Sequence, residues 1–339
     1  MELQRYEKNP ILRPVKSNQW ESEAVFNCGA IYWNNQVHLL YRAIGEYDNY
    51  ISRIGYAISS DGINFQRKNS PLFELEKEYE KWGCEDPRIT EIEGKFYITY
   101  VILSQPARQG GGLPRTALAT TTDFIHFEKK GIITPEGADD KDAVLFPEKI
   151  NGEYVMLHRP HNWIQKDVYE EKGKKYLRVK EKVIEWPIEE IPNYFPEKPS
   201  IWISYSKDLK NWIRHKVLME PKEWWEDFKI GAGAPPIKTK KGWLIIYHGV
   251  SSDGYRAGAA LLDLKNPSKV IGKTKNPILE PKEDYEKTGD VNNVVFPTGG
   301  VIINNKLFIY YGTADKYIGL ATCDLEKLLK ELTTDFNKC

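Results

Sequence analysis

The sequence predicts an all-β protein, a five-bladed β-propeller with one short helix at its C-terminal end. Three observations lead to this fold: many aromatic residues, a turn pattern that recurs five times, and a hairpin pattern that precedes each turn. Of the 339 residues, 10 are Trp, 20 are Tyr and 12 are Phe. Aromatic side chains favour strands, and recurring segments indicate a fold built from similar units.

The recurring turn follows a strand that ends in small or hydroxyl-bearing residues. An Asp comes next, and an aromatic residue or Leu follows shortly after it. An Asp suits a turn here because its side chain can accept a hydrogen bond from the backbone two residues on. The aspartates lie 62, 85, 55 and 61 residues apart. The five copies are Asp61 in YAISSDGINF, Asp123 in ALATTTDFIHF, Asp208 in WISYSKDLKNW, Asp263 in AGAALLDLKNP and Asp324 in IGLATCDLEKL.

The hairpin pattern is a strand, a polar turn with Gly or Asn, and an aromatic-rich second strand. Its five copies are GAIYWNNQVHLLYRA, RITEIEGKFYITYV, EKINGEYVMLHRP, PIKTKKGWLIIYHG and GVIINNKLFIYYG. Each hairpin and the strand after it supply most of a four-stranded sheet, so five units predict five propeller blades. A large β-sandwich or two β-domains are the alternatives, but the fixed order of the two patterns favours the propeller. We expect one domain over residues 1–339, with blades at about 23–70, 84–134, 141–215, 228–276 and 289–324.

Two segments depart from the repeat. Residues 325–333, LEKLLKELT, predict the C-terminal helix. Residues 162–200 are long, charged and contain Pro, and they account for the spacing of 85 residues in the third unit. A surface insertion is the plainest interpretation, and a lid or a partner surface is the alternative.

The composition excludes several classes of function. The 48 basic and 48 acidic residues balance, whereas nucleic acids and anionic membranes select a basic surplus. No apolar run reaches the roughly 18 residues that span a bilayer, and MELQRYEKNP has no signal-peptide core. The four cysteines have no CxxC spacing, so neither a zinc site nor a disulfide framework is indicated. We therefore expect a cytoplasmic protein that binds no metal.

The stretch WGCEDPRIT holds two adjacent carboxylates, Glu85 and Asp86. Neighbouring side chains of a strand point to opposite faces, so we expect only one of them to enter a site. The other would pair with a base such as Arg88. The two are therefore not the carboxylate pair of an ordinary glycosidase, which lies on both sides of the scissile bond. A purely structural ion pair is the alternative for this motif.

A cationic group comes from later units: Arg159 in LHRP, Lys229 in KIGAG and His248 in YHGV. Arg binds an oxyanion as a fork and Lys as a point charge, so together with a His donor they suit phosphate. A lone His in a strand is more often a core residue, but three cationic or donor-rich residues from successive blades favour a site. The chain has no Gly-rich phosphate loop followed by a helix, so a nucleotide is not implied.

Several motifs, in order, resemble glycoside hydrolase family 130, the β-mannoside phosphorylases and their hydrolase relatives. They are GCEDPRI, KDAVLFPEK with YVMLHRP, KIGAGAPPI with GWLIIYHGV and YRAGAALLDL, and VVFPTGG with YYGTAD. The resemblance extends from Asn27 to about Asp324. The family usually has Pro after the Asn of its first motif. This chain has Cys28 there, a difference that concerns the rigidity of the loop and not the chemistry.

The resemblance implies a five-bladed propeller that breaks β-mannosides with inorganic phosphate and releases α-mannose 1-phosphate. It places the catalytic acid on Asp86 and the phosphate ligands on Arg159, Lys229 and His248, with Tyr255 as a fourth. It places sugar-contacting residues on Asn27, Arg42 and Asp315, and also on Lys141 and Asp142. It implies no metal and no organic cofactor, because phosphate is a co-substrate. Homo-oligomers occur in the family.

The residues agree with this chemistry. An inverting hydrolase needs a base to activate water besides its acid, whereas phosphate is already a nucleophilic anion and needs a positive site to hold it. One acid and three cationic or donor-rich residues match the second case. A hydrolase of the same fold and a non-catalytic glycan-binding propeller remain alternatives. The linkage, β-1,2 or β-1,4, cannot be read from the sequence, and we expect loops such as 105–114 and 162–200 to decide it.

Overall fold

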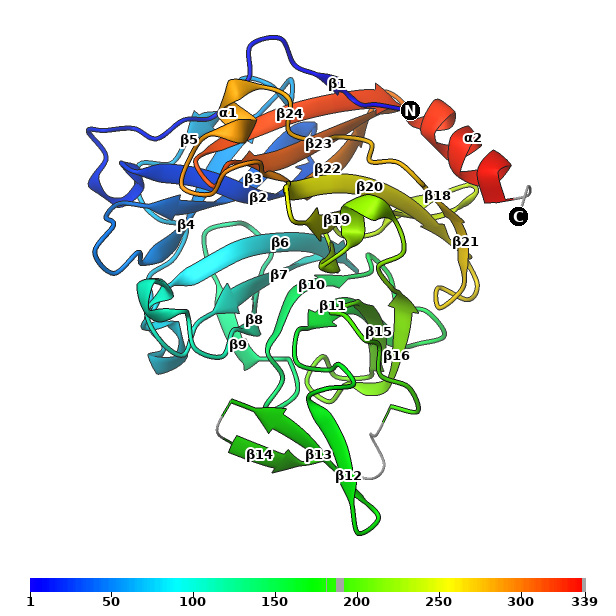
Figure 1. The fold of residues 1–339 in the computed structure, drawn as a ribbon. Coiled ribbons are helices and arrows are strands. Elements are labelled where there is room, and N and C mark those ends of the chain that lie inside the picture. Colours follow the sequence, from blue (N-terminus) through cyan, green and yellow to red (C-terminus); the bar gives the residue numbers. More distant parts are fainter. Residues whose placement is uncertain (181, 187–191, 337–339) are drawn as a thin grey trace.

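The computed structural model describes residues 1–180, 182–186 and 192–336, and its regular secondary structure is almost entirely antiparallel strands (Figure 1). Four sheets have four strands and a fifth has five. The five sheets are described here in the chain order of their first long strands. The first sheet has β2 (Ala24–Trp33), β3 (Gln36–Ile44), β4 (Ser52–Ser59) and β5 (Gln66–Arg67). The second has β6 (Cys84–Ile92), β7 (Lys95–Ile102), β8 (Arg115–Thr121) and β9 (Glu128–Ile132).

The third sheet has β10 (Asp140–Leu145), β11 (Tyr154–Pro160), β15 (Ile201–Ser206) and β16 (Ile213–Met219). The fourth has β17 (Lys229–Ala232), β19 (Gly242–Ser251), β20 (Gly254–Leu262) and β21 (Val270–Lys273), with β18 (Ile237–Thr239) also paired to β19. The fifth has β22 (Val295–Ile303), β23 (Lys306–Thr313), β24 (Tyr317–Asp324) and β1 (Gln4–Arg5). Strand β1 pairs with β24, so both ends of the described chain contribute to one sheet.

Helices are few. α1 (Asp284–Lys287) precedes the fifth sheet, and α2 (Leu325–Phe336) follows it. The predictions of an all-β chain and of a short C-terminal helix are confirmed, and the helix is three residues longer than the predicted 325–333. None of the helices in the described ranges is long and apolar enough to cross a membrane.

The first strands of neighbouring sheets lie against one another. Strand β2 contacts both β6 and β22, and β10 contacts both β6 and β17. Between the sheets, the side chains form apolar clusters such as Val25, Leu39 and Tyr310, or Ile98 and Ile54. The packing therefore brings residues from distant parts of the sequence to the shared inner edge of the sheets.

The predicted turns are present. Asn34 and Asn35, between β2 and β3, both have a left-handed backbone, as do Asn304 and Asn305 between β22 and β23. This conformation is typical of two-residue hairpins whose strands twist normally. The carboxylate of Asp61 accepts hydrogen bonds from backbone N–H groups two and three residues on, and the same holds for Asp123, Asp208 and Asp263. Asp324 instead accepts from the backbone of Lys327 at the start of α2.

A buried glutamate lies before the first long strand of four sheets, and sequence reasoning did not anticipate it. In the second sheet, Glu80 accepts the hydroxyl of Tyr100 at 2.7 Å and pairs with Lys129 at 2.5 Å. The tyrosine comes from the second strand of the sheet and the cation from its outer strand. The equivalent groups are Glu21 with Tyr41 and Arg67, Glu226 with Tyr247 and Lys273, and Glu286 with Tyr311 and Arg5. Each group links the segment that enters a sheet to two of its strands.

The third sheet has a different buried polar chain. His158 on β11 bonds Asp140 Oδ2 on β10 at 2.6 Å and Ser204 Oγ on β15 at 2.7 Å. Ser204 also bonds His215 on β16 at 2.7 Å. This row of side chains crosses all four strands of the sheet, next to Arg159 on β11.

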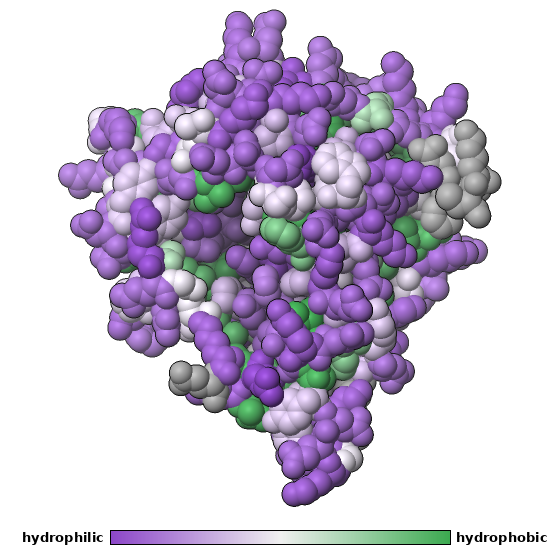
Figure 2. Space-filling model, viewed as in Figure 1, coloured by the Kyte–Doolittle hydropathy of each residue, from purple (hydrophilic) through white to green (hydrophobic). Residues whose placement is uncertain are grey.

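The predicted insertion, residues 162–200, forms a separate three-stranded sheet, apart from 181 and 187–191, which lie outside the described residues. Its strands are β12 (Val168–Glu171), β13 (Lys174–Val179) and β14 (Lys182–Glu185). It projects from the body of the molecule at the bottom of Figure 1, and its surface is largely hydrophilic in Figure 2.

Candidate active site

Irregularities in the first strands place polar side chains at the inner edge of the sheets. The register shifts between Phe26 and Cys28 in β2, between Glu85 and Arg88 in β6, and between Lys141 and Val144 in β10. At these places Asn27, Asp86 and Asp142 have φ values of 45°, 46° and 58°. Asn and Asp tolerate this left-handed conformation better than other residues with a side chain. A bulge redirects the side chain that it contains, and these three face one cavity.

That cavity, which we call the central cavity, has a volume of about 120 Å³. All ten residues that the sequence proposed for the site line it: Asn27, Arg42, Asp86, Lys141, Asp142, Arg159, Lys229, His248, Tyr255 and Asp315. They come from all five sheets and the segments next to them. Three further residues line it that were not proposed: Val291, Val294 and Phe296. Phe296 belongs to the motif VVFPTGG, and its ring centroid lies 4.5 Å from that of His248.

One side of the central cavity is acidic. Asp86 Oδ1 accepts a hydrogen bond from Asn27 Nδ2 at 2.8 Å and lies 3.3 Å from Arg42 Nη1. The other terminal nitrogen of Arg42 bonds Glu85 at 2.5 Å. A single guanidinium therefore holds both carboxylates of the motif, and Asp86 is the one that lines the cavity.

The expected partner of Glu85 was wrong. Arg88 does not pair with Glu85 but donates to the backbone oxygens of Gly233 and Asp86, at 2.6 and 2.7 Å. Strand alternation predicted that the two carboxylates point to opposite faces and that only one enters the site, and Asp86 alone lines the cavity. The bulge at Asp86 breaks the alternation, so both carboxylates can reach Arg42 although only Asp86 faces the cavity.

Asp315 is a second carboxyl on the acidic side. Burial raises its pKa to about 7, and the neighbouring carboxylates of Asp86, Asp290 and Glu85 act in the same direction against Arg42. A carboxyl with such a pKa is partly protonated near neutral pH. The acidic side therefore carries less negative charge than its residues suggest.

A second group of lining residues is mainly basic. Arg159 contacts Asp142 Oδ2 through two nitrogens, Nε at 2.8 Å and Nη2 at 2.7 Å. His248 Nε2 lies 3.6 Å from the same oxygen. Burial acts to raise the pKa of Asp142, but Arg159, His248 and Arg88 outweigh it and hold that pKa well below its usual range. The ionised Asp142 thus fixes the position of Arg159 and lies close to His248, two of the three proposed phosphate ligands.

The surroundings of Lys229 and His248 favour the neutral forms of both side chains. Burial, followed by the charges of Arg159 and Lys141, lowers the pKa of Lys229 to about 7. Burial also lowers the pKa of His248 to about 3, despite the nearby Asp142. A neutral His248 offers one N–H donor, and its Nδ1 is buried without a hydrogen-bond partner among the described residues. An anion entering this side would favour the charged form of Lys229.

Metal ligands are not grouped here. Within residues 1–180, 182–186 and 192–336, no three His, Cys, Asp or Glu side chains are placed to hold a metal ion. This arrangement offers a carboxyl and several basic side chains around one small cavity.

Comparisons with known proteins agree with the motifs. A family model described as β-1,4-mannooligosaccharide phosphorylase matches residues 2–198 and 193–334. A 1,2-β-oligomannan phosphorylase of Thermoanaerobacter sp. (strain X514) is 42% identical, with 97% of this chain and 99% of the relative covered. A β-1,4-mannooligosaccharide phosphorylase of Ruminococcus albus is 32% identical, with 94% and 87% covered. The structure of β-1,2-mannobiose phosphorylase from Listeria innocua, in complex with β-1,2-mannobiose, has a TM-score of 0.78 and 30% identity, and covers 98% of this chain and 99% of its own.

These matches place the chain among the carbohydrate-active enzymes classed as glycoside hydrolases. The chain belongs to glycoside hydrolase family 130.

Proposed function

We propose that the protein is an inverting β-mannoside phosphorylase, which uses inorganic phosphate to release α-mannose 1-phosphate. The observation that carries the proposal is the central cavity, which is lined both by Asp86 and by Arg159, Lys229 and His248. Inversion requires the nucleophile to attack from the face opposite the leaving group. A carboxyl and three basic or donor-rich side chains around one small cavity supply the acid and the phosphate site that such a reaction needs.

The acid and the basic residues of the cavity have different roles in the proposed reaction. Asp86 is the acid that supplies the proton for the departing sugar, directly or through a hydroxyl of the bound mannose. Arg159, Lys229, His248 and Tyr255 hold phosphate, and no base is needed because phosphate is already anionic. Asn27, Arg42, Lys141 and Asp315 contact the sugar. Asp142, placed with the sugar ligands by the family resemblance, contacts Arg159 directly and would also orient the phosphate site.

The proposal extends to the fold. We propose that the five sheets are blades of one five-bladed propeller over residues 1–339, with the central cavity at the mouth of its axis. The contacts of β2 with both β6 and β22, and of β10 with both β6 and β17, support this arrangement. The pairing of β1 with β24 would then close the ring.

We also propose that the linkage cleaved is β-1,2. Two relatives at 42% and 41% identity are named for β-1,2-linked mannosides, whereas the relative named for β-1,4-linked mannosides is 32% identical. No cofactor has a role in this reaction.

The test is phosphate dependence across a panel of β-1,2- and β-1,4-mannobioses. We expect α-mannose 1-phosphate to form only when phosphate is present, at a rate that saturates with phosphate. Free mannose formed at the same rate in phosphate-free buffer would instead identify a hydrolase. Binding of mannobiose without any product would identify a glycan-binding protein.

Phosphate binding is expected to weaken as the pH rises through about 7. Lys229 has a pKa of about 7, so its ammonium group is fully present below this pH and is lost above it. The KM for phosphate should therefore rise on the alkaline side. In Lys229→Arg the charge persists because an Arg side chain keeps its proton, and the alkaline rise should flatten. An identical rise in both proteins would contradict a role for Lys229 in holding phosphate.

A further inference from the structure

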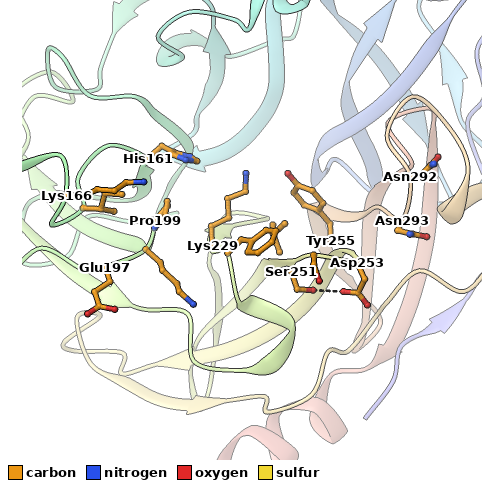
Figure 3. Close-up of a pocket in the computed structure, with 16 residues that line it drawn as sticks. His161, Lys166, Glu197, Pro199, Lys229, Ser251, Asp253, Tyr255, Asn292 and Asn293 are labelled. Atoms are coloured by element: carbon orange, nitrogen blue, oxygen red, sulfur yellow. Dashed lines mark hydrogen bonds between the residues drawn. The ribbon is translucent and has the colours of Figure 1, made fainter. Parts of the chain in front are cut away.

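Two further cavities belong to the site already described. The larger, of about 690 Å³, is drawn in Figure 3, and its residues Lys229 and Tyr255 also line the central cavity. The other, of about 510 Å³, shares Val291 and Asp315 with the central cavity. Neither of them therefore indicates a separate site.

A cavity of about 480 Å³ lies beside the insertion, and none of the described residues lines both it and the central cavity. Three segments that are far apart in the sequence meet there: the connection from β9 to β10, the turn between β15 and β16, and strands β13 and β14 of the insertion (Figure 1). We call this cavity the tryptophan pocket and define it by Glu136, Trp163, Trp186, Lys210, Trp212 and His215.

The walls of the tryptophan pocket are largely aromatic. The ring centroids of Trp163 and Trp186 are 4.7 Å apart, and those of Trp163 and His215 are 5.0 Å apart. Leu177 and Ile184 from the insertion add an apolar surface. Aromatic walls with a few polar groups are typical of small-molecule sites, whose volumes are about 300–1,000 Å³. Flat aromatic faces of this kind suit the C–H faces of a sugar ring.

Two tryptophans of the pocket have indole N–H groups without a hydrogen-bond partner. Trp163 is 1% exposed and Trp212 is 3% exposed. The Nε1 atom of each is buried and has no acceptor among the described residues. A buried indole N–H usually has an acceptor. A hydroxyl group of a bound molecule would supply one, which a purely apolar molecule cannot do.

The polar residues of the pocket favour an uncharged molecule. Burial lowers the pKa of His215 to about 3, so its ring is neutral at neutral pH. Glu136 and Lys210 are exposed at the edge of the pocket and carry opposite charges. Glu185, also at the edge, pairs with Lys174 at 2.8 Å. The edge therefore has both donors and acceptors for hydroxyl groups, without a surplus of either charge.

We propose that the tryptophan pocket is a second carbohydrate site, which binds a mannosyl unit of a β-mannoside apart from the central cavity. Aromatic walls, unpaired indole N–H groups and balanced charge are together the features that recognise a neutral sugar. The choice of a mannoside as that sugar rests on the proposed function. The insertion then has a role as well, because it supplies Trp186 and the apolar residues of the pocket.

The test counts binding sites for β-1,2-mannobiose by isothermal titration calorimetry. The Asp86→Asn protein in phosphate-free buffer serves as the background, because turnover is removed there. We expect Trp186→Ala in this background to remove one binding site. Lys210→Ala should weaken the same site several-fold, and the exposed position of Lys210 should leave the fold intact if Trp186→Ala does not. Lys207→Ala, in the same turn but outside the pocket, is the matched control and should change nothing.

Two results would overturn the second site. One is the same number and affinity of mannobiose sites with and without Trp186→Ala and Lys210→Ala. The other is loss of binding of a hydrophobic dye, anilinonaphthalene sulfonate, in Trp186→Ala while mannobiose binding is unchanged, which would identify a pocket for apolar molecules. Melting temperatures of all variants show whether they are folded.

Kinetics separates this proposal from the proposed function. In the otherwise unmodified protein, Lys210→Ala should leave kcat with mannobiose and the KM for phosphate unchanged, and a fall in kcat would contradict a site apart from the reaction. Turnover of the unmodified protein without phosphate would overturn the proposed function. Loss of a mannobiose site in Trp186→Ala would support the second carbohydrate site in that case too.

Discussion

Replacing Asp86 with Asn is expected to lower kcat by at least about 100-fold, the usual contribution of a positioned general acid. Asn has nearly the same shape and still accepts the hydrogen bond from Asn27 Nδ2, so the cavity should keep its geometry. The Asn side chain, however, cannot supply a proton as a general acid. The measurement is the rate of α-mannose 1-phosphate formation with saturating mannobiose and phosphate.

Asp123→Asn is a matched control in the same sheet. Asp123 is the aspartate of the repeated turn between β8 and β9, and Asn can accept the same backbone hydrogen bonds there. We expect this variant to keep full activity. An Asp86→Asn protein that is folded and retains activity within a few-fold would exclude Asp86 as the acid.

Replacing Glu80 with Gln is expected to lower the free energy of unfolding by about 3 kcal/mol or more, because breaking one partner of a buried ion pair leaves the other uncompensated. Glu80 is fully buried, and the Lys129 side chain that pairs with it is only 6% exposed. Gln keeps the size of the side chain and can still accept the Tyr100 hydroxyl, but its NH2 group cannot accept the backbone N–H groups of Glu76 and Lys77, so the loss includes these hydrogen bonds as well as the charge. Urea unfolding followed by fluorescence measures it.

Glu78→Gln provides the comparison within the same helical turn. The Glu78 side chain is 92% exposed and lies 3.9 Å from Lys81, and exposed pairs of this kind contribute about 0–1 kcal/mol. We expect its unfolding midpoint to stay near that of the unmodified protein. Equal midpoints for the two variants would show that the buried glutamates do not hold the sheets together.

The sequence was informative about the sheets because the turns are local. Asn34 with Asn35, and the Asp61 turn, depend on residues only a few positions apart, and their patterns are visible in one dimension. The buried glutamates depend on partners far away, such as Arg5 with Glu286. A signal was nevertheless present: an aromatic residue directly precedes Glu21, Glu80, Glu226 and Glu286.

The site also has features that the sequence predicts and features that it does not. The motifs named ten residues, and the structure brings all ten to one cavity. The partner of Glu85 was missed because strand alternation is a rule for regular strands, and the bulge at Asp86 suspends it. The sequence predicts that the loop 105–114, which supplies Arg108, contributes to specificity, but it does not predict which residues Arg108 contacts. The contact of Arg108 with Tyr47 and Tyr50 joins two loops that no local pattern connects.

The left-handed backbone at Asn27, Asp86 and Asp142 also restricts how this enzyme can change. Gly, Asn and Asp, and less readily His, adopt this conformation more easily than other residues. Glu at position 86 would keep the carboxyl group but would meet an unfavourable backbone as well as a longer side chain. Laboratory evolution of these three positions therefore has a small set of usable amino acids, and new specificities should arise more readily in the loops around the mouth.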